Sequence, residues 1–227
     1  MVIYGLLLDT DPELRQQQRT LIAAHAGQQS LDAVDRLAPE LTKLGAEHKL
    51  PLVQLALPSL RITSSNQLSA FLETLDELVH ADSRISSFEF ALQKLLTRSL
   101  DLGKSPKRSV VQYHSFNAVD SEIGILLSAL AQASTHDFAE AQASFATGAR
   151  QLKLIESQLK FNSAPFDFAA LDAALEKLAG ASGPIKQRTL LAGAHTISAN
   201  GSISVSEFEL LRAIAAALDV PLPPLSG

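Results

Sequence analysis

Two stretches of this chain carry the same pattern: ANGSISVSEFEL at positions 199–210 and ADSRISSFEFAL at positions 81–92. They align without a gap, and Ala199 stands 118 positions after Ala81. Each begins with residues that tolerate a left-handed backbone and so close a helix, Asp82-Ser83 in the first and Asn200-Gly201 in the second. One isoleucine follows, and then the sequence S-x-x-E. Each stretch is therefore predicted to end one helix, turn tightly around a buried isoleucine and begin another.

The serine and glutamate of each stretch have the spacing of an N-terminal capping box. Ser86 and Ser204 stand at the N-cap positions, and Glu89 and Glu207 follow three residues later. In such a box the serine oxygen accepts from the N3 amide, while the glutamate accepts from the amide of the cap residue. Loss of a cap of this kind costs about 1 kcal/mol. Capping is therefore the preferred role of both glutamates.

A shortened calcium loop is the alternative interpretation of the same residues. An EF-hand loop needs D-x-[DN]-x-[DN]-G and a later bidentate glutamate. The first stretch offers Asp82 and Glu89 with Arg84 between them, and the second offers Asn200 and Glu207. Calcium prefers six to eight oxygen ligands, and an arginine adds positive charge to the loop. Metal binding by Asp82, Glu89, Asn200 and Glu207 thus stands behind capping as an interpretation.

The composition favours an all-α fold. Hydrophobic residues make up 46% of the 227 residues, and aromatic residues only 5%. The formal net charge is −5 and no basic run exceeds Lys107-Arg108, so we expect no nucleic-acid partner. The absence of cysteine excludes disulfides, thiolate zinc sites and cysteine nucleophiles. No apolar run reaches the roughly 20 residues that span a bilayer, so we expect no direct membrane insertion.

Proline, glycine and capping residues predict where the other helices lie. In the first half, helices are expected over 12–26, 30–44, 51–57 and 64–79, the second kinked or divided by Pro39 and the third stopped near Pro58. In the second half they are expected over 118–133, 135–151 with an extension to about 160, 167–179, 184–197 and 204–218. Thr135 is expected to cap the 135–151 helix. Val110 to Tyr113 is expected to be an extended loop rather than a strand.

Residues 104–108 form the clearest polar linker in the chain. They separate an N-terminal half, 1–103, that holds the first hairpin from a C-terminal half, 104–227, that holds the second. Two architectures agree with this division: one shared helical core, or two small domains. We expect one continuous body, because the short helices before the first hairpin would otherwise leave its leucine faces uncovered.

The sequence shows none of the catalytic motifs considered below and predicts no enzyme activity in this chain. The six histidines include no H-E-x-x-H pair, and neither G-x-S-x-G nor a phosphate-binding loop occurs. No catalytic or cofactor-binding residue is therefore predicted.

The two turns resemble the TerB-like helical module, whose pattern reads A-[DN]-G-x-I-x-x-x-E. Residues 199–207 follow this pattern, and residues 81–89 follow it with Ser83 in place of the glycine. Three further segments, YGLLLD at 4–9, LPLVQLALP at 50–58 and LLRAI at 210–214, widen the resemblance. Together they are similar to the C-terminal region of bacterial membrane zinc metallopeptidases of the HtpX and CAAX-prenyl-protease type.

This resemblance implies a cytoplasmic domain that is tethered to the inner membrane through a longer parent protein. The zinc site and the membrane helices of such proteins precede this region, so zinc is implied for the parent only and no cofactor for this chain. The abrupt apolar start at Met1 is also expected of a fragment. The implied partners are the catalytic and membrane portion of the same polypeptide, and a peptide or protein substrate.

The leading functional hypothesis is a non-catalytic regulatory or docking domain of a membrane zinc metallopeptidase. One alternative is a stand-alone TerB-like stress protein that binds a divalent metal. Another is a general helical scaffold that holds an amphipathic helix or peptide in a leucine-lined groove. An exposed apolar patch on the folded surface would be the mark of the scaffold.

Overall fold

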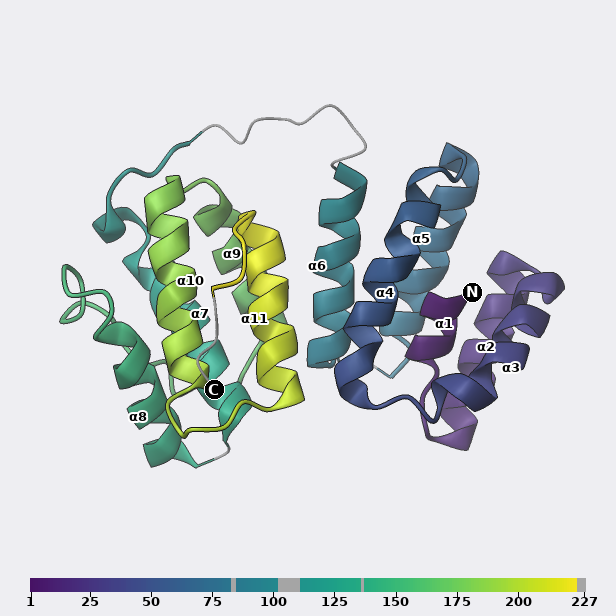
Figure 1. Cartoon of the computed structure of the whole chain (residues 1–227), viewed down its shortest axis with the longest axis horizontal. Helices are drawn as coiled ribbons and strands as arrows, with labels where there is room; N and C mark the ends of the chain where they lie inside the picture. Colours follow the sequence, from purple (N-terminus) through teal and green to yellow (C-terminus); the bar gives the residue numbers. More distant parts are fainter. Residues whose placement is uncertain (83–84, 102–110, 136, 224–227) are drawn as a thin grey trace. The chain divides into compact units, whose positions relative to one another are not determined.

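A computed structural model describes residues 1–82, 85–101, 111–135 and 137–223. Within them the chain is all-α, with eleven α-helices and no β-strand (Figure 1). The chain forms two compact units, Met1–Lys104 and Ser105–Gly227. That boundary lies one residue from the expected one, and the expectation of one continuous body stays a prediction. The predicted linker at 104–108 and the turn residues Ser83 and Arg84 lie outside the described residues.

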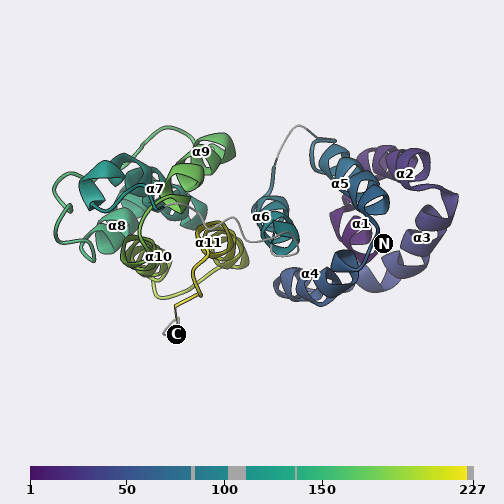
Figure 2. The same cartoon turned by 90° about the horizontal axis from the view of Figure 1, so that it is seen from above.

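The N-terminal unit is built around its first, short helix. Its helices are α1 (Val2–Leu7), α2 (Pro12–Ala26), α3 (Gln28–Leu41), α4 (Ala46–Arg61), α5 (Ser65–Val79) and α6 (Ser87–Asp101). Helix α1 packs against α3, α4 and α5, and Figure 2 shows it near the centre of the unit. Four of its six residues are buried: Ile3, Tyr4, Leu6 and Leu7. The apolar start of the chain is therefore a core helix of this unit.

The proline-based helix boundaries of this unit were wrong. Helix α4 begins at Ala46 and continues through Pro51 and Pro58 to Arg61. Each internal proline removes one helical hydrogen bond, but α4 also packs against α1 and α6 and buries Leu50 and Val53. Helix α3 begins two residues earlier than expected, and Pro39 lies in its last turn rather than dividing it. Tertiary packing thus outweighs the local cost of proline in both helices.

The C-terminal unit surrounds one long buried helix. After a short 3-10 turn at Phe116–Ala118, its helices are α7 (Asp120–Ser134), α8 (Phe138–Ala149), α9 (Phe168–Ala179), α10 (Gly183–Ile197) and α11 (Val205–Leu218). Helix α7 contacts α8, α9, α10 and α11. Ile123, Leu126, Leu127 and Leu130 of α7 are fully buried. As expected, Val111 to Tyr113 is no strand: Tyr113 forms only an isolated bridge with Ala181.

Two expectations for α8 were wrong. Asp137, not Thr135, caps this helix: its Oδ1 accepts from the Glu140 N–H at 2.9 Å. The predicted extension of the helix to about residue 160 is a series of turns. The N–H groups of Leu152 and Ile155 each reach a carbonyl only three residues back. Both side chains are nevertheless buried. The helix-like spacing of these apolar residues therefore indicates that they are buried, not that they lie in a helix.

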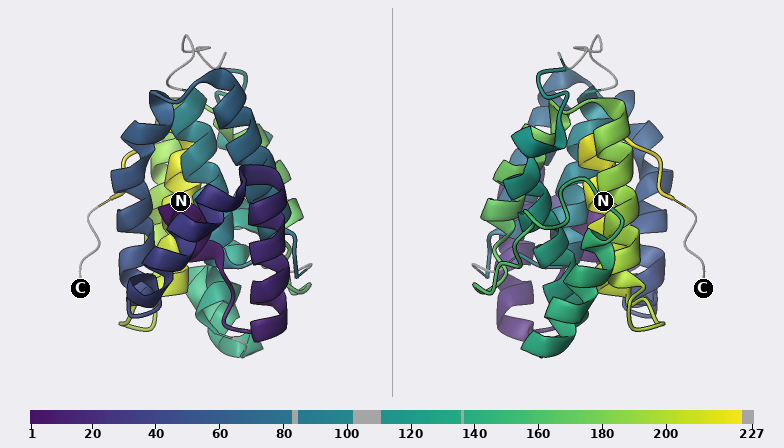
Figure 3. Two further views of the ribbon diagram at one scale, coloured as in Figure 1. Left: turned by 90° about the vertical axis from the view of Figure 1, so that its right-hand side faces the viewer. Right: turned by 90° about the vertical axis from the view of Figure 1, so that its left-hand side faces the viewer.

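Two glycines determine how closely α10 approaches its neighbours in the C-terminal unit. Figure 3 (right) shows this unit from the side of α8 and α10. A Cβ on Gly148 of α8 would overlap the Thr196 hydroxyl and lie 2.7 Å from the Ala192 carbonyl oxygen. A Cβ on Gly193 of α10 would lie 2.8 Å from Leu130 of α7. The small residues therefore allow the backbones to pack closely.

The two units share one helix order, except that α3 has no helical counterpart among the described residues of the C-terminal unit. Helix α10 begins 118 residues after α5 (Gly183 against Ser65), and α11 begins 118 residues after α6 (Val205 against Ser87). The packing corresponds as well. Helix α4 packs on α6 as α9 packs on α11, α2 packs on α5 as α8 packs on α10, and α1 contacts α4 and α5 as α7 contacts α9 and α10. The repeat therefore extends from the turns to the helices around them.

No helix of the described residues combines the length and apolar character that crossing a bilayer requires.

Candidate functional site

The first predicted capping box is confirmed at the start of α6. The Ser86 N–H donates to Glu89 Oε2 at 2.7 Å, and the Glu89 N–H donates to Ser86 Oγ at 3.2 Å. Burial raises the pKa of Glu89 above its ordinary value, the Ser86 hydrogen bonds oppose this rise, and the negative charges of Asp82 and Asp9 add to it. This glutamate therefore stays in its capping position at an electrostatic cost.

The second capping box is confirmed at the start of α11 and has an additional partner. The Ser204 N–H donates to Glu207 Oε2 at 2.6 Å, and the Glu207 N–H donates to Ser204 Oγ at 3.3 Å. The Ser134 hydroxyl, in the last residue of α7, donates to Glu207 Oε1. Glu207 is only 1% exposed. It therefore connects the start of α11 to the end of α7, a contact that the sequence did not predict.

The backbone of the second turn agrees with expectation, but the isoleucines do not. Gly201 has a φ of 80°, the left-handed conformation predicted for it. The Asn200 Oδ1 accepts from the Ser202 N–H at 3.0 Å. Ile85 and Ile203, expected to be buried, are both half-exposed. The isoleucines are thus covered only in part, while the polar caps supply side-chain hydrogen bonds in both turns.

Three or more His, Asp or Glu residues that could hold a metal ion do not come together anywhere in the described part of the chain. In the second turn, both oxygens of Glu207 and the Oδ1 of Asn200 already accept hydrogen bonds. In the first, the Ser86 N–H already donates to Glu89 Oε2, and the negative charge of Asp82 helps to raise the pKa of Glu89. Metal binding by Asp82, Glu89, Asn200 and Glu207 stays a prediction, and an ion would have to displace the capping bonds.

The outward side of α4 carries an unusual row of exposed apolar residues. Pro51, Leu55, Pro58 and Ile62 follow one another at intervals of four, three and four residues, which places them on one face of the helix. The exposed fraction of Leu55 is 78% and that of Ile62 is 88%. We call this set the α4 face. All four of its side chains are exposed.

An apolar groove lies beside the α4 face, between α4 and α5. Its volume is about 620 Å³, and its lining combines apolar residues such as Tyr4, Ala56, Leu60 and Phe71 with polar ones that include His25, Ser59, Thr63 and Gln67. The rings of Tyr4 and Phe71 stack with centroids 5.1 Å apart, and the Tyr4 hydroxyl donates to the Phe71 carbonyl at 3.3 Å. The floor of the groove is thus fixed by α1 and α5, and its wall is α4.

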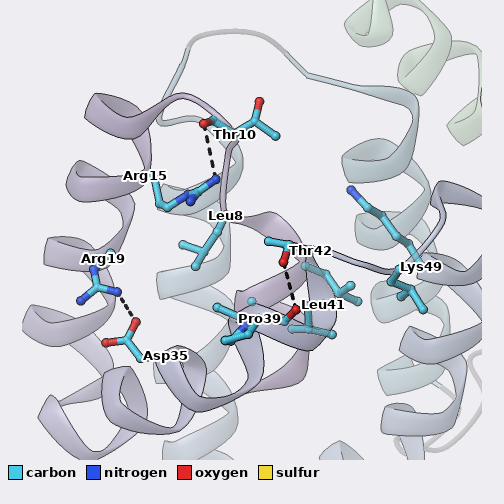
Figure 4. A pocket seen from close by; sticks show the side chains of 13 residues that line it. Leu8, Thr10, Arg15, Arg19, Asp35, Pro39, Leu41, Thr42 and Lys49 are labelled. Carbon is cyan, nitrogen blue, oxygen red and sulfur yellow. Dashed lines mark hydrogen bonds and ion pairs between the residues drawn. The ribbon is translucent and has the colours of Figure 1, made fainter.

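A second cavity of the N-terminal unit differs from the groove in its charge. It has a volume of about 480 Å³ and is lined by residues of α1, α2, α3 and the first turns of α4 (Figure 4). Leucines and Pro39 form much of its wall, while Arg15, Arg19, Lys49 and Asp35 supply its charges. We call this cavity the basic pocket. In Figure 4 the Arg15 and Lys49 side chains approach it from opposite sides, with Leu8 and Thr42 between them.

A buried glutamine fixes the loop that borders the basic pocket. Gln18 of α2 is 3% exposed. Its Nε2 donates to the Leu7 carbonyl at 3.0 Å, and its Oε1 accepts from the Asp9 N–H at 2.7 Å. The Arg15 Nε in turn donates to the Asp9 carbonyl at 2.7 Å. Neither Gln18 nor Arg15 was predicted to be a site residue, because their contacts depend on how α1 and α2 pack.

Comparison with known proteins gives no relative: no protein-family model, curated protein or solved structure matches this chain.

Proposed function

We propose that this chain is a non-catalytic docking module that binds a partner polypeptide along the α4 face. The observation that supports the proposal is the exposure of Leu55 and Ile62 on one side of a helix whose other side is buried. Fully burying a leucine or isoleucine is favourable by about 1.5–3 kcal/mol relative to leaving it exposed. Two such residues at helical spacing, flanked by two prolines, offer a partner a continuous apolar strip.

The apolar groove between α4 and α5 adds a recess next to this strip. An amphipathic helix can lay its apolar residues along such a surface, with anchors spaced three and four residues apart. The partner in this proposal is therefore an amphipathic helical segment of a polypeptide.

The resemblance of the turns and of the 4–9, 50–58 and 210–214 segments supports a more specific setting for the module. In this proposal the chain is a regulatory or substrate-docking domain of a membrane zinc metallopeptidase, cytoplasmic and tethered through the parent. Its partner is then either the catalytic and membrane portion of the same polypeptide or a peptide substrate. Zinc belongs to the parent, and this chain itself carries out no reaction.

Selection of helical peptides tests the docking role directly. A phage-displayed library of amphipathic helices is selected against the wild-type chain, and the affinities of selected peptides are measured for Leu55→Asp/Ile62→Asp. Gln54→Asp/Asn66→Asp is the matched control, because Gln54 and Asn66 are exposed polar residues of α4 and α5. We expect at least tenfold weaker binding for the first variant and none of that loss for the control. A selection without peptides that depend on Leu55 and Ile62 would contradict the proposal.

The DNA upstream of the Met1 codon tests the metallopeptidase setting separately. An open frame that encodes membrane-spanning segments and an H-E-x-x-H motif is the expected result. A stop codon in that frame would remove the setting and leave the docking role to be judged by peptide binding alone.

A further inference from the structure

The basic pocket holds more positive than negative charge. Arg15, Arg19 and Lys49 line it together with one carboxylate, Asp35. Asp35 forms an ion pair with Arg19. Among the described residues, neither Arg15 nor Lys49 has a carboxylate partner. In a chain with a formal net charge of −5, this pocket therefore favours an anion.

Two hydrogen bonds hold the Arg15 guanidinium in place and leave its other N–H donors for a ligand. Its Nε donates to the Asp9 carbonyl at 2.7 Å and its Nη2 to the Thr10 carbonyl at 3.4 Å. A guanidinium has five N–H donors in a rigid fork, so three remain for a ligand. Because Gln18 fixes the loop that provides these carbonyls, the fork needs little reordering to receive a carboxylate.

Lys49 supplies the second charge from the opposite side. Its Nζ lies 5.2 Å from the centroid of the Phe88 ring, which is a cation–π contact and leaves the charge uncompensated. Lys49 is half-buried in the first turns of α4. An anion between Arg15 and Lys49 would meet two cations that reach it from α2 and α4.

The rest of the basic pocket is largely apolar. Leu6, Leu8, Leu41, Leu44 and Pro39 all line it. Its volume of about 480 Å³ lies within the range of small-molecule sites. A simple inorganic anion would satisfy the two cations but would leave the half-buried side chains of Leu8, Leu41 and Leu44 uncovered. The complementary ligand therefore joins one negative charge to an aliphatic group.

We propose that the basic pocket binds an aliphatic carboxylate, with the carboxylate held between Arg15 and Lys49 and the aliphatic group against Leu8 and Leu41. Two sources share this chemistry: a free medium-chain fatty acid, and the C-terminal carboxylate of a peptide that ends in an apolar residue. The proposal is independent of the docking function, because it uses none of the four residues of the α4 face.

Calorimetric titration of the whole chain with sodium decanoate tests the site. Decanol is the neutral ligand control, and Lys49→Met removes the second cation with little change in side-chain volume. Lys43→Met is the matched protein control, because Lys43 is exposed and pairs with Glu40 outside the pocket lining. We expect decanoate to bind the wild type and Lys43→Met alike and to bind Lys49→Met at least tenfold more weakly. Equal affinity for both lysine variants, or equal affinity for decanol, overturns the proposal.

A peptide arm distinguishes the two sources. Acetyl-Gly-Gly-Leu is titrated with a free C-terminal carboxylate and, in parallel, with an amidated C-terminus. Binding of the free acid alone, with the same loss in Lys49→Met, supports the peptide source, and binding of decanoate alone supports the fatty acid. Failure of both ligands to bind overturns the proposal whatever the result of the peptide selection on the α4 face.

Arg15→Lys keeps the positive charge but loses the guanidinium fork. It is expected to weaken ligand binding by a smaller factor than the double variant Lys49→Met/Arg15→Gln.

Discussion

Gly148 shows how a single missing side chain shapes the C-terminal unit. A Cβ added at Gly148 would lie 2.7 Å from the Ala192 carbonyl oxygen and would overlap the Thr196 hydroxyl. Gly148→Ala is therefore expected to lower the free energy of unfolding by about 1–3 kcal/mol, the usual cost of overpacking. Urea unfolding of the wild type and of Gly148→Ala measures this difference in the free energy of unfolding. Gly183→Ala is the control, since nothing lies within 4 Å of a Cβ there. An equal loss in both variants would contradict the close approach of α8 and α10.

Glu89 gives a prediction about pH. Burial raises the pKa of this carboxyl above its ordinary value, so the folded protein holds the proton more tightly than the unfolded chain does. Glu89 therefore contributes least to stability at pH values above its raised pKa. Its contribution increases as the pH falls through the raised pKa toward the ordinary pKa of a glutamate. Glutamine keeps the S-x-x-Q capping pattern without the charge. Glu89→Gln is expected to be more stable than wild type near pH 7, by a margin that narrows toward pH 4.

Thermal unfolding across this pH range checks the expectation, with Glu156→Gln, an exposed glutamate, as control. A margin that widens toward pH 4, or one that the control reproduces, would show that Glu89 is not the residue responsible.

Both capping boxes were predictable because serine and glutamate stand three residues apart in one turn of chain. The Ser134–Glu207 hydrogen bond was not, since its partners are 73 positions apart and only the packing of α7 on α11 brings them together. The half-exposure of Ile85 and Ile203 has the same origin. An apolar residue in a short turn is predicted to be buried, but how far it is covered depends on helices that the local sequence does not describe.

Helix α4 is expected to become more stable when a proline is removed. Pro58 lies inside the helix, where it removes the hydrogen bond to the Gln54 carbonyl and crowds the preceding turn. Pro58→Ala should therefore raise the free energy of unfolding, by at most about 3 kcal/mol. Pro184→Ala in the first turn of α10 is the control, because a proline there costs no helical hydrogen bond. Urea unfolding compares the two, and a destabilised Pro58→Ala would mean that α1 and α6 require the proline's backbone geometry.

The helix boundaries that were predicted correctly and those that were not differ in what determines them. Caps and breaks such as Asp11, Asp167 and Gly27 act within a few residues, and α2 and α9 begin and end close to where they were expected. The helix boundaries predicted from the prolines of α4 and the helix predicted from the apolar spacing after Ala149 were wrong. In both segments tertiary packing determines the backbone structure. The basic pocket could not be predicted at all. Its charges come from α2, α3 and α4, which the sequence alone does not bring together.

The C-terminal unit is expected to fold without the rest of the chain. It is compact and has its own buried helix, α7, with four helices packed around it. Residues 105–227 expressed alone should therefore show a helical circular dichroism spectrum and one cooperative thermal transition. A helical signal that fades gradually on heating, with strong binding of a hydrophobic dye, would show instead that this core needs the first 104 residues.

The shared helix order of the two units bears on the history of this chain. Gene duplication gives two copies of one fold, and only one of them has to preserve any given property. The positions of the second copy that match Leu55, Pro58 and Ile62 hold Ala173 and Glu176 of α9 and Gly180 directly after it. The second copy therefore has no counterpart of the α4 face, while its own core contains the longer central helix. Under the proposed docking function, the recognition surface therefore belongs to the first copy alone, and the second copy contributes a separate helical core.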